Sequence, residues 1–283
     1  MDRRRFAALS ASTLASLTRV PSILARQATP AADLPMLTIE LTDTGFVVPR
    51  QIPAGYTALT VTNTSTNPVS HWLMASLPPG KTDAEIEEFL ASEEDTEAIA
   101  FDDLSFIGVP DWPAPGGSVT GIVDLQPGTY LLLDPIGGRQ EIGRTNVTGS
   151  PDSTLAPEGD LVVTLKDMTI TLPDTAFTTS SRRWQIENIG SIQHDVTILP
   201  APAELTEDDL MLYLSLPDDA TPPPGVPALA YEPVIGIGVL SPGKRSWLDV
   251  TLEPGHYIAI CMLPFGTGYP HAMDGMFVFF DIA

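Results

Sequence analysis

Short runs of alternating hydrophobic and polar residues recur along the chain. Leu37–Leu41 shows this alternation clearly, and Leu161–Leu165 and Phe277–Phe280 are short, more apolar runs that are also read as strands. A period of two is typical of strands that bury one face. The chain also contains 28 prolines and 22 glycines, which favour many short strands joined by turns over long helices. The pattern therefore predicts an all-β fold built from Greek-key β-sandwiches.

Two landmarks occur twice, in the same order. A strand that enters an Asn-containing turn leads to His71 and again to His194, and an apolar stretch follows each histidine. Later in each copy, a Pro-Gly turn leads through Tyr130 or Tyr257 into an apolar strand. Landmarks that repeat in order at nearly constant spacing indicate an internal duplication.

Each copy also carries a short acidic segment with helical spacing. The segments begin at Thr82 and Thr206, and an acidic residue three positions later gives the spacing of a capping box. Apolar residues then recur at positions i, i+3 and i+4, as on one face of a helix. They are Ile86, Phe89 and Leu90 in the first copy and Leu210, Tyr213 and Leu214 in the second.

These observations predict two diverged domains, each with a short inserted acidic helix. We expect the first at residues 34–150 and the second at 158–283, because residues 149–157 have the composition of a linker. Residues 1–32 precede both domains and are interpreted as an export signal and pro-segment.

The N-terminus carries the features of that signal. Arg3, Arg4 and Phe6 resemble a twin-arginine signal, and a weakly apolar run follows from Ala7 to Leu17. This run is too short and too polar to cross a membrane. We therefore expect an exported protein with no membrane span in its mature chain, located in the periplasm, outside the cell or at the cell envelope.

The net charge of −22 over 283 residues restricts the partners. A surface this acidic repels the phosphates of nucleic acids, so DNA or RNA binding is not expected. The same surface is a candidate docking face for a basic redox protein. The sequence leaves the oligomeric state open.

Cys261 is the single cysteine of the chain, so an intramolecular disulfide is excluded. In an exported protein, an unpaired cysteine is a buried inert thiol, an intermolecular bridge or a metal ligand. Cys261 ends the apolar strand that follows the Gly255 turn, and His271 and Met276 come next.

This arrangement resembles the cupredoxins, the small blue-copper proteins related to plastocyanin and azurin. The resemblance implies that His194, Cys261, His271 and Met276 bind copper in a type 1-like site. Two imidazoles and a thiolate form a trigonal set that suits Cu(I) and Cu(II), and an axial thioether tunes the potential. Asp195 stands where many members of the family have an asparagine that helps to fix the ligand loop.

The two copies differ at these positions. Nine residues separate Cys261 from His271, more than is usual in the family. In the first copy, His71 matches His194, but Asp134 occupies the cysteine position, and neither histidine nor methionine follows through Val147. The first copy is therefore interpreted as a degenerate domain with a structural or docking role.

Three hypotheses for function follow. The first is an exported copper-binding protein that transfers one electron through the second domain. The alternative is a metal-free cupredoxin-like binding or structural module, which predicts that Cys261 and His271 lie far apart and that apolar side chains surround the thiol. The third is a copper enzyme, which needs additional histidine ligands beyond the four in this chain. We therefore expect an electron carrier or binding protein and not an enzyme.

Overall fold

The fold is known from a computed structural model of the whole chain. It describes residues 34–67, 71–77, 82, 84–85, 104–134, 141–151, 156–173, 182–217, 222–264 and 268–283. The predicted export signal lies outside these ranges, as do Ile86, Phe89 and Leu90. Within them, helices are all too short or too polar to cross a membrane.

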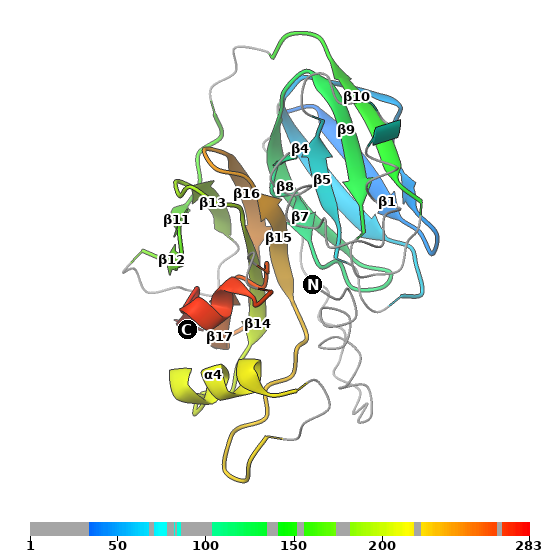
Figure 1. Cartoon of the computed structure of the whole chain (residues 1–283). Helices are drawn as coiled ribbons and strands as arrows, with labels where there is room; N and C mark the ends of the chain where they lie inside the picture. Colours follow the sequence, from blue (N-terminus) through cyan, green and yellow to red (C-terminus); the bar gives the residue numbers. More distant parts are fainter. Residues whose placement is uncertain are drawn as a thin grey trace.

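An eight-stranded sheet runs through both halves of the chain (Figure 1). Its strand order is β12-β11-β13-β16-β8-β4-β1-β2, so it begins in the second half and ends in the first. From one edge to the other the strands are Thr169–Thr171, Leu161–Lys166, Arg182–Asn188, Arg245–Val250, Ser118–Leu125, Gly55–Asn63, Met36–Leu41 and Phe46–Val47.

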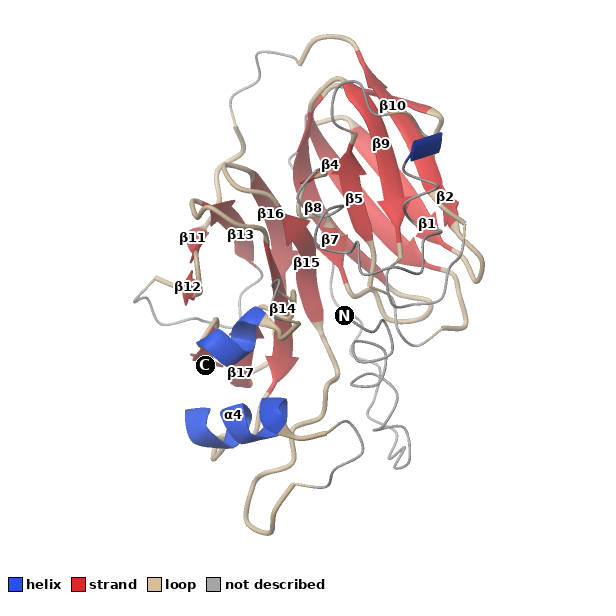
Figure 2. Ribbon diagram, viewed as in Figure 1, coloured by secondary structure: helices blue, strands red, loops and turns tan. Residues whose placement is uncertain are grey.

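Two five-stranded sheets form the opposite layer (Figure 2). The first has the order β3-β10-β9-β5-β6, with strands Gln51–Pro53, Gly143–Thr148, Gly128–Leu133, Leu73–Ser76 and Ser105–Phe106. The second has the order β18-β17-β14-β15-β7, with strands Phe277–Ile282, Gly255–Ile260, His194–Pro200, Ile235–Leu240 and Pro110–Asp111. Since β7 comes from the first half, this sheet also joins the two halves.

The halves repeat the same strand pairings. In the first half, β1 pairs in parallel with β4 and antiparallel with β2, and β4 pairs with β8. In the second half, β11 pairs in parallel with β13 and antiparallel with β12, and β13 pairs with β16. The predicted all-β sandwich fold is confirmed. The boundaries of the two domains stay a prediction.

A single hydrophobic core cluster draws on all three sheets. Leu37, Ile39 and Leu41 of β1 are buried in alternation, and so are Leu161, Val163 and Leu165 of β11. They pack with residues of the opposite layer, such as Met74 and Ile198. Burial of this apolar surface holds the layers together and gives β14 and β17 a rigid setting.

The halves meet most closely where β8 pairs with β16, with Gly121 opposite Leu248. A Cβ atom at Gly121 would lie 2.2 Å from the carbonyl oxygen of Trp247 and 2.7 Å from Cγ of Pro110. Contacts this short are not tolerated, so glycine is required for the close approach of the two strands.

The second acidic segment forms helix α4, Glu207–Ser215. Its predicted capping box is present, because Thr206 and Asp209 each accept a hydrogen bond from the other's backbone N–H. Leu210 is the buried residue of its apolar face. In the first half, Thr82 and Glu85 form the same reciprocal bonds.

Candidate metal centre

Two neighbouring strands and a short helix deliver the predicted ligands to one point. His194 is the first residue of β14, and Cys261 follows the last residue of β17, its antiparallel neighbour. His271 begins the 3-10 helix η1, His271–Asp274, which leads into β18. The ligands therefore lie at one end of a rigid sheet.

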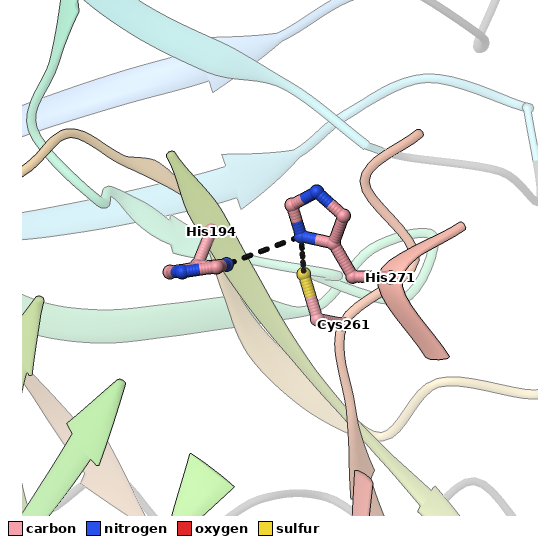
Figure 3. A group of neighbouring side chains, drawn as sticks. All are labelled: His194, Cys261 and His271. Carbon is pink, nitrogen blue, oxygen red and sulfur yellow. Dashed lines mark hydrogen bonds between the residues drawn. The ribbon is translucent and has the colours of Figure 1, made fainter. Parts of the chain in front are cut away.

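The side chains converge in the manner expected of metal ligands. The Nδ1 atom of His271 lies 3.1 Å from Nδ1 of His194 and 3.4 Å from Sγ of Cys261 (Figure 3). One ligand atom from each residue lies within 4.8 Å of the others. In the part of the chain that the structure describes, these residues are the group of three or more potential ligands that meets this criterion.

The long loop between Cys261 and His271 closes on itself. The N–H of His271 donates to the carbonyl of Leu263, and the N–H of Ala272 donates to the carbonyl of Cys261, each at 3.0 Å. Pro264 and Pro270 form a bridge across its base. The extra length therefore does not separate His271 from Cys261.

Asp195 fixes the start of this loop. Its Oδ1 atom accepts hydrogen bonds from the backbone N–H of Met262 at 2.9 Å and of Leu263 at 3.3 Å. Its own N–H donates to Sγ of Cys261 at 3.5 Å. An aspartate therefore fixes the ligand loop, the role that the resemblance assigned to an asparagine at this position.

Burial keeps the two histidines neutral. It lowers the pKa of His194 to about 4, with a further contribution from His271, and it also lowers the pKa of His271. Neutral imidazoles have the lone pair that a metal ion requires. Burial, followed by the charge of Asp195, raises the pKa of the Cys261 thiol, so a metal ion binding there displaces a proton.

The orientation of His194 also indicates a ligand. Its Nε2 atom is buried and has no hydrogen-bond partner among the described residues, while its Nδ1 atom faces the cluster. A buried polar atom without a partner costs free energy. The ring of His194 therefore directs Nδ1, and not Nε2, toward His271.

Met276 lies beside the cluster. Its carbonyl accepts from the N–H of Cys261 at 3.0 Å, and its N–H donates to the carbonyl of His271 at 3.1 Å. The side chain is fully buried, and Gly275, with φ of 90°, turns the chain from η1 into β18 just before it. The role of the Met276 thioether as an axial ligand stays a prediction.

The first half has a different arrangement at the matching histidine. Nδ1 of His71 forms a buried ion pair with Asp111, and the ring stacks on Trp112 with centroids 5.1 Å apart. Asp111 also accepts from the backbone N–H of Trp72 and Trp112. Sequence reasoning missed this partner, because Asp111 lies forty positions away and matches none of the repeated landmarks.

Comparisons with known proteins were made at the levels of sequence and structure. No family model and no curated protein sequence matches the chain. Among solved structures, auracyanin B matches at 17% identity with a TM-score of 0.29, covering 47% of this chain and 95% of its own. Auracyanin from Roseiflexus castenholzii matches at 19% identity with a TM-score of 0.29, covering 43% and 94%.

Multicopper oxidases are also among the matched structures. The blue copper oxidase from Nitrosomonas europaea matches at 13% identity with a TM-score of 0.24, covering 87% of this chain and 85% of its own. The expectation that the protein is not an enzyme is therefore wrong as an exclusion. That expectation depended on the number of histidines in the chain. This number limits only the metal centres that a single copy of the chain can form.

The geometry of the cluster supports copper as the cofactor. A cysteine sulfur with two neutral imidazoles is the trigonal donor set that suits copper in both common oxidation states. His194, Cys261 and His271 are the residues that would hold it.

Proposed function

We propose that this is an exported copper protein that transfers one electron at a type 1-like site formed by His194, Cys261 and His271. The observation that carries the proposal is the convergence of one ligand atom from each of His194, Cys261 and His271 within 4.8 Å in a buried site. Copper would supply the one-electron couple. The protein supplies two neutral imidazoles, a thiolate and a rigid frame.

The surroundings of the site suit electron transfer. Rigid ligands reduce the rearrangement that accompanies a change in oxidation state. Here Asp195 clamps the backbone after Cys261, and η1 bonds back to the carbonyls of Cys261 and Leu263. The site is thus held from both sides. We also propose the Met276 thioether as the weak axial ligand, because its backbone bonds to Cys261 and His271.

The alternative, a metal-free binding or structural module, predicted a large separation between Cys261 and His271. Their ligand atoms lie 3.4 Å apart, which does not support that prediction. It also predicted a thiol among apolar side chains, and Cys261 does belong to the hydrophobic core cluster. The alternative is therefore kept as an outcome of the test.

A spectroscopic titration tests the proposal. The mature protein receives one equivalent of Cu(II), and we expect an intense thiolate-to-copper band near ~600 nm that is lost in Cys261→Ala. His256→Ala is the matched control. His256 lies away from the site, bonded to Asp281 at 2.7 Å and stacked on Phe279. A wild-type protein without this band would favour the metal-free module.

Export and docking belong to the same proposal. The arginine-containing N-terminus supports export, and the acidic surface supports docking of a basic redox protein. Cell fractionation of the full chain and of an Arg3→Lys, Arg4→Lys variant tests export. Retention of the variant in the cytoplasm is expected, and equal export of both would contradict the twin-arginine interpretation.

A further inference from the structure

The three candidate ligands are shielded from the solvent. His194 and Cys261 are 0% exposed and His271 is 1% exposed. A one-electron partner cannot touch any of them, so an electron has to cross intervening protein. Electronic coupling falls more steeply across a gap between atoms than along covalent and hydrogen bonds. An electron would therefore pass more readily along a route of covalent and hydrogen bonds that leads from the site toward the surface.

Such a route leaves Cys261 through β14. The N–H of Asp195 donates to Sγ of Cys261 at 3.5 Å, and the backbone continues through Val196 to Thr197. The Oγ1 atom of Thr197 accepts a hydrogen bond from the indole Nε1 of Trp112 at 3.2 Å. Trp112 follows β7 in the first half of the chain, so this bond joins the site to the other half.

The position of Trp112 is tightly determined. Its φ of 66° is a left-handed conformation that is unfavourable for a large side chain. Asp111 holds it by accepting the N–H of Trp112 at 2.8 Å, and His71 stacks on the indole. Gly236 leaves room beneath it, since a Cβ atom there would lie 3.0 Å from Cδ1 of Trp112. Strain retained in this way indicates a function for the ring.

A second aromatic ring lies against Trp112. The ring of Tyr231 lies edge-on to the ring of Trp112, with centroids 6.2 Å apart. Burial, followed by the charge of Asp195, raises the pKa of the Tyr231 hydroxyl. The residue as a whole is only half-buried. Tyr231 therefore links the buried Trp112 ring to the protein surface.

We propose that Thr197, Trp112 and Tyr231 form the route by which an electron passes between the metal site and a one-electron partner at the surface near Tyr231. The inference rests on the proposed function. In the step, Cu(I) loses one electron and becomes Cu(II), while an outer-sphere one-electron oxidant gains it. No covalent bond forms or breaks, and no proton moves.

The experiment measures electron transfer from the Cu(I) form of the full protein to a cobalt(III) phenanthroline complex by stopped flow. Thr197→Val removes the hydroxyl with little change of shape, and Trp112→Phe removes the indole N–H. The matched control is Trp247→Phe. The Trp247 indole is also buried and also donates at 3.2 Å, to Gln185, and its ring lies edge-on to Tyr56.

We expect a several-fold lower rate in Thr197→Val and Trp112→Phe and the wild-type rate in Trp247→Phe. The visible band and the reduction potential of all three should stay as in the wild type. Unchanged rates in both route variants would overturn the proposal. So would a shifted band or potential, since that result would make Trp112 a positioning residue. A wild-type protein without the thiolate band would refute the proposed function itself, and the route with it.

Discussion

His71 and His194 hold matching places in the two halves and have opposite surroundings. Both are buried, and each lies at the start of the segment that forms the matching strand, β5 or β14. Nδ1 of His71 faces the carboxylate of Asp111, while Nδ1 of His194 faces His271 and the thiol of Cys261. The neighbour supplied by another segment, and not the strand itself, decides what each histidine does.

The pKa values follow the same division. Burial lowers the pKa of both imidazoles, but at His71 the surrounding carboxylates, with Asp111 contributing most, outweigh burial and the net pKa is raised. At His194 the second imidazole adds to the effect of burial, and the pKa falls to about 4. One histidine is stabilised in its charged form, as in an ion pair, and the other in its neutral form, as a ligand requires.

The largest effect expected is on copper binding. His194→Gln should abolish the thiolate-to-copper band, because it removes one of the three donors. His71→Gln should leave the band unchanged, because Asp111 already occupies its Nδ1 atom. Absorbance after one equivalent of Cu(II) distinguishes the two variants. Equal loss in both would show that the two halves are not functionally different.

The next effect concerns the ligand loop. Asp195→Ala removes the acceptor for the N–H groups of Met262 and Leu263, so the loop after Cys261 loses its clamp. We expect roughly a 10–100-fold weaker copper affinity, as for other residues that orient ligands. Competition with a chelator of known affinity measures it. Asp195→Asn keeps an acceptor oxygen and is the control, so an equal loss in that variant would point to charge instead of geometry.

A smaller effect is expected where the halves join. Gly121→Ala forces a Cβ atom against the backbone of Trp247, so we expect a loss of roughly 1–3 kcal/mol in the free energy of unfolding. Chemical denaturation followed by tryptophan fluorescence measures it. In Gly255→Ala the new Cβ atom would meet Tyr257 at 3.5 Å, an ordinary contact, and stability should change little. Equal losses would show that the junction is not tightly packed.

The smallest effect is a dependence on pH. A histidine with a raised pKa contributes its full stabilisation below its unfolded value of about 6.5 and loses it as the pH rises through the folded value. The advantage of the wild type over His71→Gln in free energy of unfolding should therefore shrink as the pH rises. Denaturation at a series of pH values measures this difference. A constant difference would mean that His71 carries no charge in its pair with Asp111.

The sequence by itself determined much of the fold and of the site. Alternation in Leu37–Leu41 predicts a strand because a pleated strand places alternate side chains on opposite faces. The resemblance around Cys261 identified His194 and His271, which the structure places in one cluster. These features depend on local periodicity and short motifs, which can be recognised along a single chain.

Only the tertiary structure decided how distant segments meet. No local pattern links β8 to β16, Asp111 to His71 or Trp112 to Thr197, because each contact joins segments that are far apart in the sequence. The nine residues after Cys261 were equally compatible with a ligand loop and with a separated His271. Hydrogen bonds from His271 and Ala272 back to Leu263 and Cys261 close that loop and complete the cluster. The ligand types were thus encoded locally, and their convergence was decided by the fold.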